Sequence, residues 1–293
     1  DLVIADEVHN YVSPEYFNFF ANNKFVRILG LSAYIDPIKL RLLNSIAPVV
    51  ESISTLKAQD LGLISPFKIY NVPVRLTTDE QIEYDKADKS FNGLFSFFNK
   101  DLKTMFACMN TNVYSNFLAK KGMVLDASVA SYPFMCNAAM AKRKNIIYNS
   151  KSKIKAVKKL SNIFSEKKAI IFSQTIEFAD KVTDELDNCV SFHSKIPKKK
   201  RNENLNLLKS GNSITRISTA KALNEGMNVP DISMAIIASG TSKTKDMIQR
   251  IGRAVRWEAN KEASIFRLYI QDSQEEKWVS ASQEKYKVEQ LEL

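Results

Sequence analysis

Short apolar runs alternate with amphipathic stretches in the second half of the chain, and this alternation limits the possible folds more than any other feature. From residue 150, Ile154, Val157 and Leu160 recur at helical spacing and precede the apolar run 169–173. The later predicted elements are, in order, helix 176–187, a strand ending at Phe192, helix 200–209, strands 214–218 and 234–238, helix 244–256 and strand 265–270. Strands that alternate with helices pair in parallel, so residues 149–275 are predicted to form a doubly wound α/β sheet.

The first part of the chain contains two apolar runs that each stop at polar residues. Residues 2–5 are followed by Asp6-Glu7, and residues 26–31 by Ser32-Ala33. Continuous apolar runs are typical of buried parallel strands, whose carboxyl ends line ligand sites in open α/β sheets. The other elements expected in this unit, 1–78, are a helix over 14–20 and final strands over 49–53 and 67–76.

A helical segment is expected between the two units. Thr77 or Thr78 can cap a helix, with Glu80 or Gln81 placed three residues on. A stripe of apolar side chains then follows at helical spacing, formed by Phe91, Leu94, Phe95, Phe98 and Leu102. We interpret this stripe as core packing rather than as a platform for stacked bases. Residues 79–148 are therefore predicted to be a helical insertion, and residues 276–293 a C-terminal tail.

The net charge of +10 is concentrated in the second unit, where residues 149–275 hold 23 basic and 14 acidic side chains. The basic side chains form two clusters, one of Lys151, Lys153, Lys155, Lys158 and Lys159, the other of Lys195, Lys198, Lys199, Lys200 and Arg201. Each cluster alone is compatible with a solvated helix face or a nuclear-import-like run. Together with the motifs below, they favour contact with the phosphate backbone of a nucleic acid.

The tetrapeptide Asp6-Glu7-Val8-His9 directly follows the first predicted strand. An Asp in this place can hold Mg²⁺ through water, and a neighbouring Glu can orient and deprotonate an attacking water in phosphoryl chemistry. Such a string also arises at ordinary strand ends with solvated acids. Its weight therefore depends on the rest of the chain.

Three arginines near the end of the second unit support the interpretation of Asp6 and Glu7 as residues of phosphoryl chemistry. Arg250, Arg253 and Arg256 stand three residues apart and share one face of a predicted helix. Asp246 stands four residues before Arg250, whereas Arg253 and Arg256 have no acid at that spacing. Unpaired arginines suit anionic phosphate, because the guanidinium fork can donate two hydrogen bonds to it. Arg253 and Arg256 are therefore candidate arginine fingers.

With these residues in place, the chain resembles the second half of a superfamily 2 helicase over most of its length. The resemblance is carried, in chain order, by Asp6-Glu7-Val8-His9 (the D-E-x-H box), Ser32-Ala33-Tyr34 (the S-A-T coupling motif), Ile170-Ile171-Phe172-Ser173, the segment from Ser218 to Pro230, and Gln249 to Arg256 (Q-R-x-G-R-x-x-R). The A-L-N-E-G-x-x-V-P wording is most similar to the UvsW/XPB-like DNA helicases of phages and DNA repair.

The resemblance implies tandem RecA-like parallel-sheet lobes separated by a helical insertion, with ATP and Mg²⁺ as cofactors. It implies that Asp6 ligates Mg²⁺ through water, that Glu7 activates water, and that His9 couples to Gln249. The remaining implied roles are nucleotide contact by Gly226 and Asn228, γ-phosphate contact by Arg253 and Arg256, nucleic-acid contact by Thr219, Lys221, His193 and Arg250, and coupling by Ser32 and Ala33. Two residues depart from the family pattern: Tyr34 replaces Thr, and Asn228 replaces the commoner Asp. For His193, an ordinary loop histidine is an equal alternative.

One expected motif is absent from the sequence. None of the eight glycines begins the string G-x-x-x-x-G-K-[S/T], whose amides and Lys cradle phosphates in this class. In the family this P-loop precedes the D-E-x-H box, so we expect the first lobe to be truncated at its N-terminus and the chain to be a piece of something longer. The missing P-loop region is then a required partner, and an open sheet without it should expose apolar surface.

These observations favour the C-terminal portion of an ATP-dependent helicase or translocase, acting on DNA rather than RNA by branch resemblance. The alternatives are a nucleic-acid-binding subunit or a restriction-system motor fragment without ATPase activity of its own. No apolar stretch reaches the length of a membrane span, and Cys108, Cys136 and Cys189 are too dispersed for a zinc site. The expected location is the cytoplasm of a phage-infected or bacterial cell, or the nucleus in a eukaryote.

Overall fold

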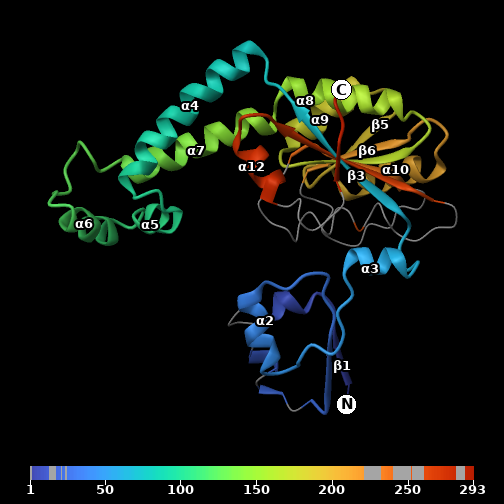
Figure 1. Cartoon of the computed structure of the whole chain (residues 1–293), viewed down its shortest axis with the longest axis horizontal. Helices are drawn as coiled ribbons and strands as arrows, with labels where there is room; N and C mark the ends of the chain where they lie inside the picture. Colours follow the sequence, from blue (N-terminus) through green and yellow to red (C-terminus); the bar gives the residue numbers. More distant parts are fainter. Residues whose placement is uncertain are drawn as a thin grey trace.

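The computed structural model describes residues 2–12, 18–20, 22–23, 25–220, 232–239, 252, 261–281 and 288–293. Figure 1 shows three parts: a small N-terminal unit, a helical arm, and a larger unit built around a sheet. No helix in the described part of the chain is both long and apolar enough to cross a bilayer.

The larger unit is a seven-stranded sheet whose strands all run parallel, in the order β5-β6-β4-β7-β8-β3-β9. Its strands are β3 (Phe67–Val74), β4 (Lys168–Ser173), β5 (Cys189–Phe192), β6 (Arg216–Ala220), β7 (Ile232–Ile237), β8 (Ala263–Ile270) and β9 (Val288–Gln290). Every residue of β8 is buried, as expected of a strand covered on both faces. The predicted doubly wound α/β sheet is therefore confirmed; the helix predicted over 244–256 lies outside the described residues.

Helices cover both faces of this sheet and divide its core in two. On one face α8 (Lys151–Ile163) and α9 (Ile176–Glu185) pack over Ala169, Ile171 and alternate residues of β7 and β8. On the other face, Leu208 of α10 (Lys198–Ser210) packs with Ile170 and Phe172. The two clusters take alternate residues of β4, because successive side chains of a strand point to opposite faces.

Strand β3 corrects the prediction for the first unit. It pairs in parallel with β8 from Phe67↔Ala263 to Val74↔Ile270, so the expectation that 67–76 closes the first unit is wrong. The strand expected over 49–53 is absent as well, since these residues have no regular structure and Val49 and Val50 are exposed. The tail 276–293 contains the end of α12 (Gln274–Ala281) and the edge strand β9, which pairs with β3.

The N-terminal unit contains a sheet of two parallel strands, β1 (Leu2–Ala5) and β2 (Arg27–Gly30). A 3₁₀ turn, η1 (Val8–Val12), lies between β1 and β2 in the chain. Two short helices, α2 (Pro37–Asn44) and α3 (Thr55–Asp60), follow β2. Of the helix predicted over 14–20, only residues 18–20 are described, and they are helical. Val8, Val12, Phe20 and Leu43 form a small core of their own.

The arm consists of α4 (Thr78–Phe97), α5 (Leu102–Ala107), α6 (Thr111–Lys120) and α7 (Tyr132–Tyr148), which confirms the helical prediction for 79–148. Thr77 caps α4 in a capping box with Glu80. The aromatic stripe packs as predicted at Phe91 and Phe98, whereas Leu102 is exposed. The stripe ends there because Asn99 and Lys100 take positive φ values of 56°, which terminate α4.

One carboxylate joins the arm to the larger unit. Glu80 Oε2 accepts a hydrogen bond from Thr77 N (3.1 Å) at the start of α4. Its Oε1 accepts one from Lys151 N (2.7 Å) at the start of α8. Glu80 therefore caps two helices at once and connects the start of the arm to the start of α8.

The first basic cluster of the sequence is divided in the structure. Lys153 is fully buried, and its Nζ lies 2.6 Å and 2.8 Å from the two carboxylate oxygens of the equally buried Glu275 on α12. Lys158 pairs on the surface with Glu185 at 3.0 Å. The interpretation of Lys153 as part of a solvent-facing phosphate contact is therefore wrong, because its ammonium group is buried in an ion pair with Glu275.

Candidate nucleotide and nucleic-acid site

The acidic pair of the D-E-x-H box lies at the carboxyl end of β1. Asp6 is exposed, and its Oδ1 accepts a hydrogen bond from Glu7 N at 2.9 Å. Glu7 takes a positive φ of 50°, so the backbone turns sharply here and enters η1. The turn separates the directions of two adjacent carboxylates, which gives each of them its own surroundings.

His9 lies two residues further on and is buried, with 3% of its surface exposed. Its Nδ1 is 2.7 Å from Ser32 Oγ and 3.2 Å from Glu7 Oε2. Ser32 Oγ donates its own proton to the carbonyl oxygen of Tyr34 at 2.9 Å, so it accepts from His9. We therefore assign the proton of a neutral His9 to Nδ1, where it faces both the hydroxyl and the carboxylate.

These contacts join the ends of β1 and β2 into one unit. Leu31 N donates to Ala5 O, and Val8 N donates to Leu31 O, both at 2.9 Å. Lys39 Nζ of α2 donates to the carbonyl oxygen of His9 at 3.0 Å. The structure thus brings together three predicted residues, Glu7, His9 and Ser32, whereas the predicted coupling residue Ala33 is exposed.

The departure at Tyr34 is explained by this geometry. The group that receives the Ser32 proton is the main-chain carbonyl of Tyr34, which any residue supplies. Replacing Thr by Tyr therefore leaves this hydrogen bond intact. Sequence reasoning missed the carbonyl and Lys39, because neither a main-chain acceptor nor a contact across 30 residues has a local signal.

In the larger unit, Thr219 lies near the carboxyl end of β6, beside Phe172 of β4 and Phe192 of β5. Its side chain is 1% exposed, and its Oγ1 has no hydrogen-bond partner among the residues that the structure describes. Ser218 Oγ is equally buried and unpartnered there. Ser173 Oγ of β4 donates to the carbonyl oxygen of Thr219 at 3.1 Å, which fixes the two strand ends together.

His193 follows β5 and is 4% exposed. Its Nε2 lies 2.8 Å from Asp180 Oδ1 on α9, and Ser191 Oγ donates to the same oxygen at 3.0 Å. Nδ1 of His193 has no hydrogen-bond partner within the described ranges. The ring is thus held from one side by Asp180, a residue that the sequence analysis did not single out.

The other predicted site residues lie outside the described residues. They are Lys221, Gly226, Asn228, Gln249, Arg250, Arg253 and Arg256. The roles assigned to them stay predictions.

Asp6 and Glu7 fit what a magnesium ion needs in a phosphate-transfer site. Mg²⁺ keeps several waters and takes one or two protein carboxylates together with substrate phosphates, so a dedicated cage is not required. In the described part of the chain, no three His, Cys, Asp or Glu side chains converge as a metal cage. The exposed Asp6 carboxylate, with one oxygen held by Glu7 N, is a donor of the right kind for contact through water.

The pKa shifts in the described residues belong to structural groups rather than to this site. Burial raises the pKa of the Cys189 thiol to about 12, and Cys108, Cys136 and Cys189 are all buried and free. Burial also lowers the pKa of Arg216, whose side chain is fully buried on β6. Arg216 donates to the carbonyl oxygens of Ser161 (2.7 Å) and Phe164 (2.8 Å), so it caps the end of α8.

Comparison with known proteins shows what the chain is similar to. Residues 152–258 match the model of the helicase conserved C-terminal domain. Over 276 residues the chain is 26% identical to the DNA 3'-5' translocase XPB2 of Sulfurisphaera tokodaii, an alignment that covers 91% of this chain and 58% of that protein.

Solved structures agree on the fold. The Pyrococcus furiosus Hef helicase domain superposes with a TM-score of 0.62 at 14% identity, covering 96% of this chain and 73% of that one. S. cerevisiae Dbp5 bound to RNA and ADP BeF3 gives 0.59 at 12%, covering 100% and 59%. The chain spans less than two thirds of XPB2 and of Dbp5. The sheet has the RecA-like fold of these helicase structures, and the chain is similar to the C-terminal portion of a superfamily 2 helicase.

Proposed function

We propose that this chain works as part of an ATP-dependent helicase or translocase that moves along or remodels a nucleic-acid strand, DNA in preference to RNA. The observation that carries the proposal is the chain of contacts from Glu7 to the Tyr34 carbonyl: Glu7 Oε2 lies 3.2 Å from His9 Nδ1, which is hydrogen-bonded to Ser32, and Ser32 donates to Tyr34 O. It links the residue that would activate water to the motif that would sense the strand. The preference for DNA is supported by the likeness to a DNA translocase.

In this proposal Glu7 is the general base of ATP hydrolysis. Its carboxylate lies 3.2 Å from His9 Nδ1 and would accept a proton from an attacking water. Bound Mg²⁺-ATP would supply the phosphoanhydride bond that is broken, and Asp6 would hold the ion through water. With Nδ1 protonated, the Nε2 of a neutral His9 is an acceptor, which suits the amide of Gln249 as its partner.

The remaining roles follow the family motifs. Gly226 and Asn228 would contact the nucleotide, while Arg253 and Arg256 would stabilise charge on the γ-phosphate. Strand contacts are assigned to Thr219, Lys221, His193 and Arg250, and coupling to Ser32 and Ala33. Because Thr219 and His193 are buried here, their contact with a strand requires their present surroundings to rearrange.

The phosphate-binding loop would come from a segment that completes the first lobe. The β1–β2 sheet leaves Leu2, Ile4 and Leu31 from 47% to 60% exposed. A hollow of about 420 Å³ lies against it, lined by Val8, the residues of β2 and the end of α2. A parallel sheet is normally covered on both faces, so this surface suits further strands and helices of the same lobe.

The location we propose is cytoplasmic in a phage or bacterial system, or nuclear in a eukaryote.

The proposal is tested by the ATPase rate of a chain that includes the P-loop region, with Glu7→Gln and with Glu83→Gln, an exposed carboxylate on α4, as the matched control. General base catalysis contributes on the order of 10²–10⁴ in rate, so Glu7→Gln should lose at least about 100-fold of the DNA-stimulated turnover. Undiminished turnover in this variant would remove Glu7 as the base.

The second candidate function is a nucleic-acid-binding subunit or restriction-system motor fragment without turnover of its own. The concentration of positive charge in the larger unit favours it independently of the box residues. It predicts strand binding that weakens steeply between 50 and 200 mM salt, and no ATP hydrolysis even with the P-loop region added.

A further inference from the structure

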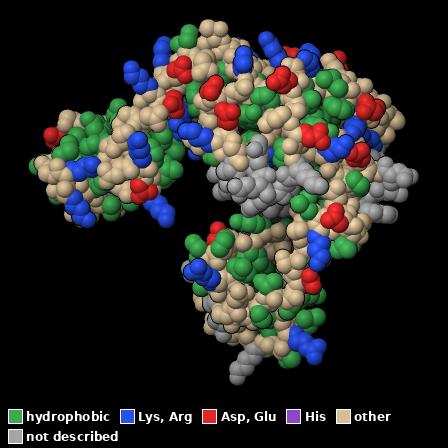
Figure 2. All heavy atoms as spheres, in the orientation of Figure 1, with side chains coloured by type: hydrophobic (Ala, Val, Ile, Leu, Met, Phe, Trp, Pro, Cys, Tyr) green, Lys and Arg blue, Asp and Glu red, His purple; other side chains and the backbone are tan. Residues whose placement is uncertain are grey.

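Three lysines of α8, Lys151, Lys155 and Lys159, form a row without ion-pair partners among the described residues, whereas basic side chains near them are paired. Lys151, Lys155 and Lys159 are spaced four residues apart, which places them about 6 Å from one another along one side of the helix. All three are exposed, and none has an acidic partner within 4 Å among the residues that the structure describes. Figure 2 shows basic side chains on the outer surface over α8.

Their neighbours show that acidic partners were available. Lys153 and Lys158 of the same helix pair with Glu275 and Glu185, and Lys181 of α9 pairs with Glu177 at 2.6 Å. Like charges four residues apart on a helix repel, and cations near its N-terminus oppose the helix dipole. The first turn of α8 has no acidic residue of its own, and Glu80 binds its first backbone N–H rather than a lysine side chain. The three lysines are therefore cations that no ion pair neutralises among the described residues.

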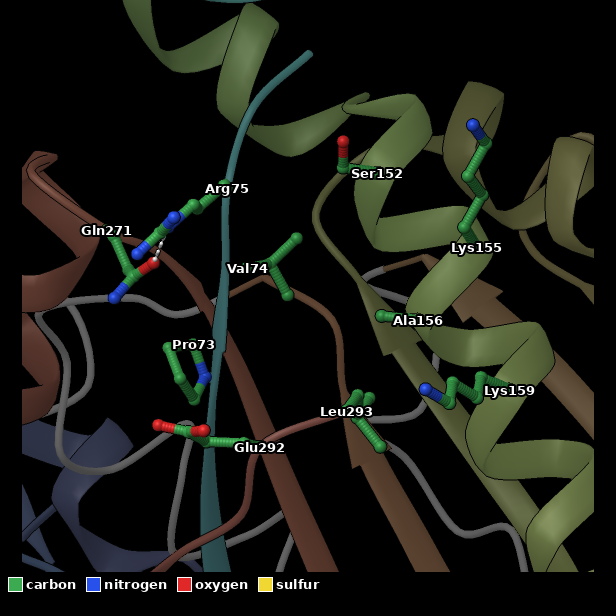
Figure 3. Close-up of a pocket in the computed structure, with 10 residues that line it drawn as sticks. All are labelled: Pro73, Val74, Arg75, Ser152, Lys155, Ala156, Lys159, Gln271, Glu292 and Leu293. Carbon is green, nitrogen blue, oxygen red and sulfur yellow. Dashed lines mark hydrogen bonds between the residues drawn. The ribbon is translucent and has the colours of Figure 1, made fainter.

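A hollow of about 440 Å³ lies directly beside the row. Ser152, Lys155 and Lys159 line it on the α8 side, and Val74 and Arg75 line it at the end of β3 (Figure 3). Arg75 Nε donates to Gln271 Oε1 at 3.0 Å, which holds the guanidinium on the opposite rim. Glu292 is the one acidic side chain among the ten lining residues. The hollow thus has an apolar floor and a rim with three cations.

We infer that the lysine row and this hollow form a second phosphate-binding surface, which takes the sugar-phosphate backbone of a nucleic acid outside the helicase motifs. The inference rests on the proposed function for the identity of the polyanion. A backbone fits better than a compact anion, because the cations are spread along a row and across a rim rather than gathered at one point. Lysines that lack partners can neutralise phosphates without first breaking an ion pair.

The test compares two double variants of the full chain that each remove two positive charges. Lys155→Gln/Lys159→Gln removes unpaired lysines of the row, and the control Lys158→Gln/Lys181→Gln removes paired lysines from the same two-helix face. The readout is the affinity for a fluorescent DNA duplex between 50 and 200 mM salt, with thermal unfolding to verify that both variants are folded.

Each lost phosphate contact lowers the slope of log K against log salt by about 0.9, so the row variant should lose about 1.8 from the slope and up to about 60-fold in affinity at 0.1 M salt. The control should keep the slope of the unmodified chain. Equal behaviour of the two variants would overturn the inference, as would loss of binding to phosphatidylserine vesicles with DNA affinity unchanged. If the unmodified chain binds no nucleic acid, the proposed function itself fails.

Discussion

The buried ion pair between Lys153 and Glu275 gives a sharp test of how the larger unit is held together. Both side chains are fully buried, and Glu275 also accepts a hydrogen bond from Ile270 N at 3.1 Å. Replacing Lys153 by Met would leave a buried carboxylate without its partner. Breaking a buried pair in this way costs about 3–5 kcal/mol of the free energy of unfolding.

The measurement is urea unfolding followed by circular dichroism. With an m-value of about 2–3 kcal/mol/M, a loss of this size lowers the midpoint by at least about 1 M. The double variant Lys153→Met/Glu275→Leu should recover most of the loss, because neither charge then remains buried. A Lys153→Met midpoint within about 0.3 M of the unmodified chain would refute the reasoning.

The same pair predicts a pH dependence for Glu275→Gln. Burial lowers the pKa of Lys153, and the carboxylate of Glu275 opposes that shift. Without Glu275 the folded state binds its proton less tightly than the unfolded state, whose lysine titrates near 10.5. The unfolded state then holds more protons, so the stability deficit of Glu275→Gln should shrink as pH rises from 7 toward 10. A deficit that is constant or grows over this range would contradict the assignment.

Three further predictions follow from the site and its support. Ser32→Ala removes the hydroxyl partner of His9 Nδ1 and should weaken the DNA stimulation of ATP turnover. Tyr34→Thr should keep that stimulation within about twofold, because the acceptor is the main-chain carbonyl of residue 34. Parallel ATPase assays of the two variants with and without DNA measure the difference. Arg216→Met should cost about 1–3 kcal/mol in urea unfolding, because carbonyl groups at the end of α8 lose a buried donor. Cys189 should resist alkylation at pH 8 in the folded chain and react after unfolding, as mass spectrometry would show.

The alternation of strands and helices in the larger unit was predictable, because its strands are continuous apolar runs and its helices repeat apolar residues every three to four positions. The strand near residue 67 was predictable as a strand but not as a member of this sheet. Its partner is β8, about 196 residues away at Asn71 and Arg267, and apolar pattern does not encode pairing over that distance. The prediction of a strand at 49–53 failed for the opposite reason: these residues have strand-like composition, but no strand among the described residues pairs with them.

The part of the candidate site that consists of side chains in known motifs was predictable from the sequence. Glu7, His9 and Ser32 stand in recognisable motifs, and the structure brings them together. The Tyr34 carbonyl and the Lys39 contact are invisible in sequence, since one is main chain and the other depends on where α2 packs. The prediction for Lys153 failed because a lysine within a basic run is normally exposed to solvent. Its burial depends on Glu275, which is 122 residues away in the sequence and cannot be identified as its partner from local pattern.

The Glu80 carboxylate ties the starts of α4 and α8 together, so a change in angle at this junction would be amplified along the arm. The 20 residues of α4 extend about 30 Å from that point. A turn of about 10° at the root therefore sweeps the far end of α4 through about 5 Å, roughly the length of one helical turn.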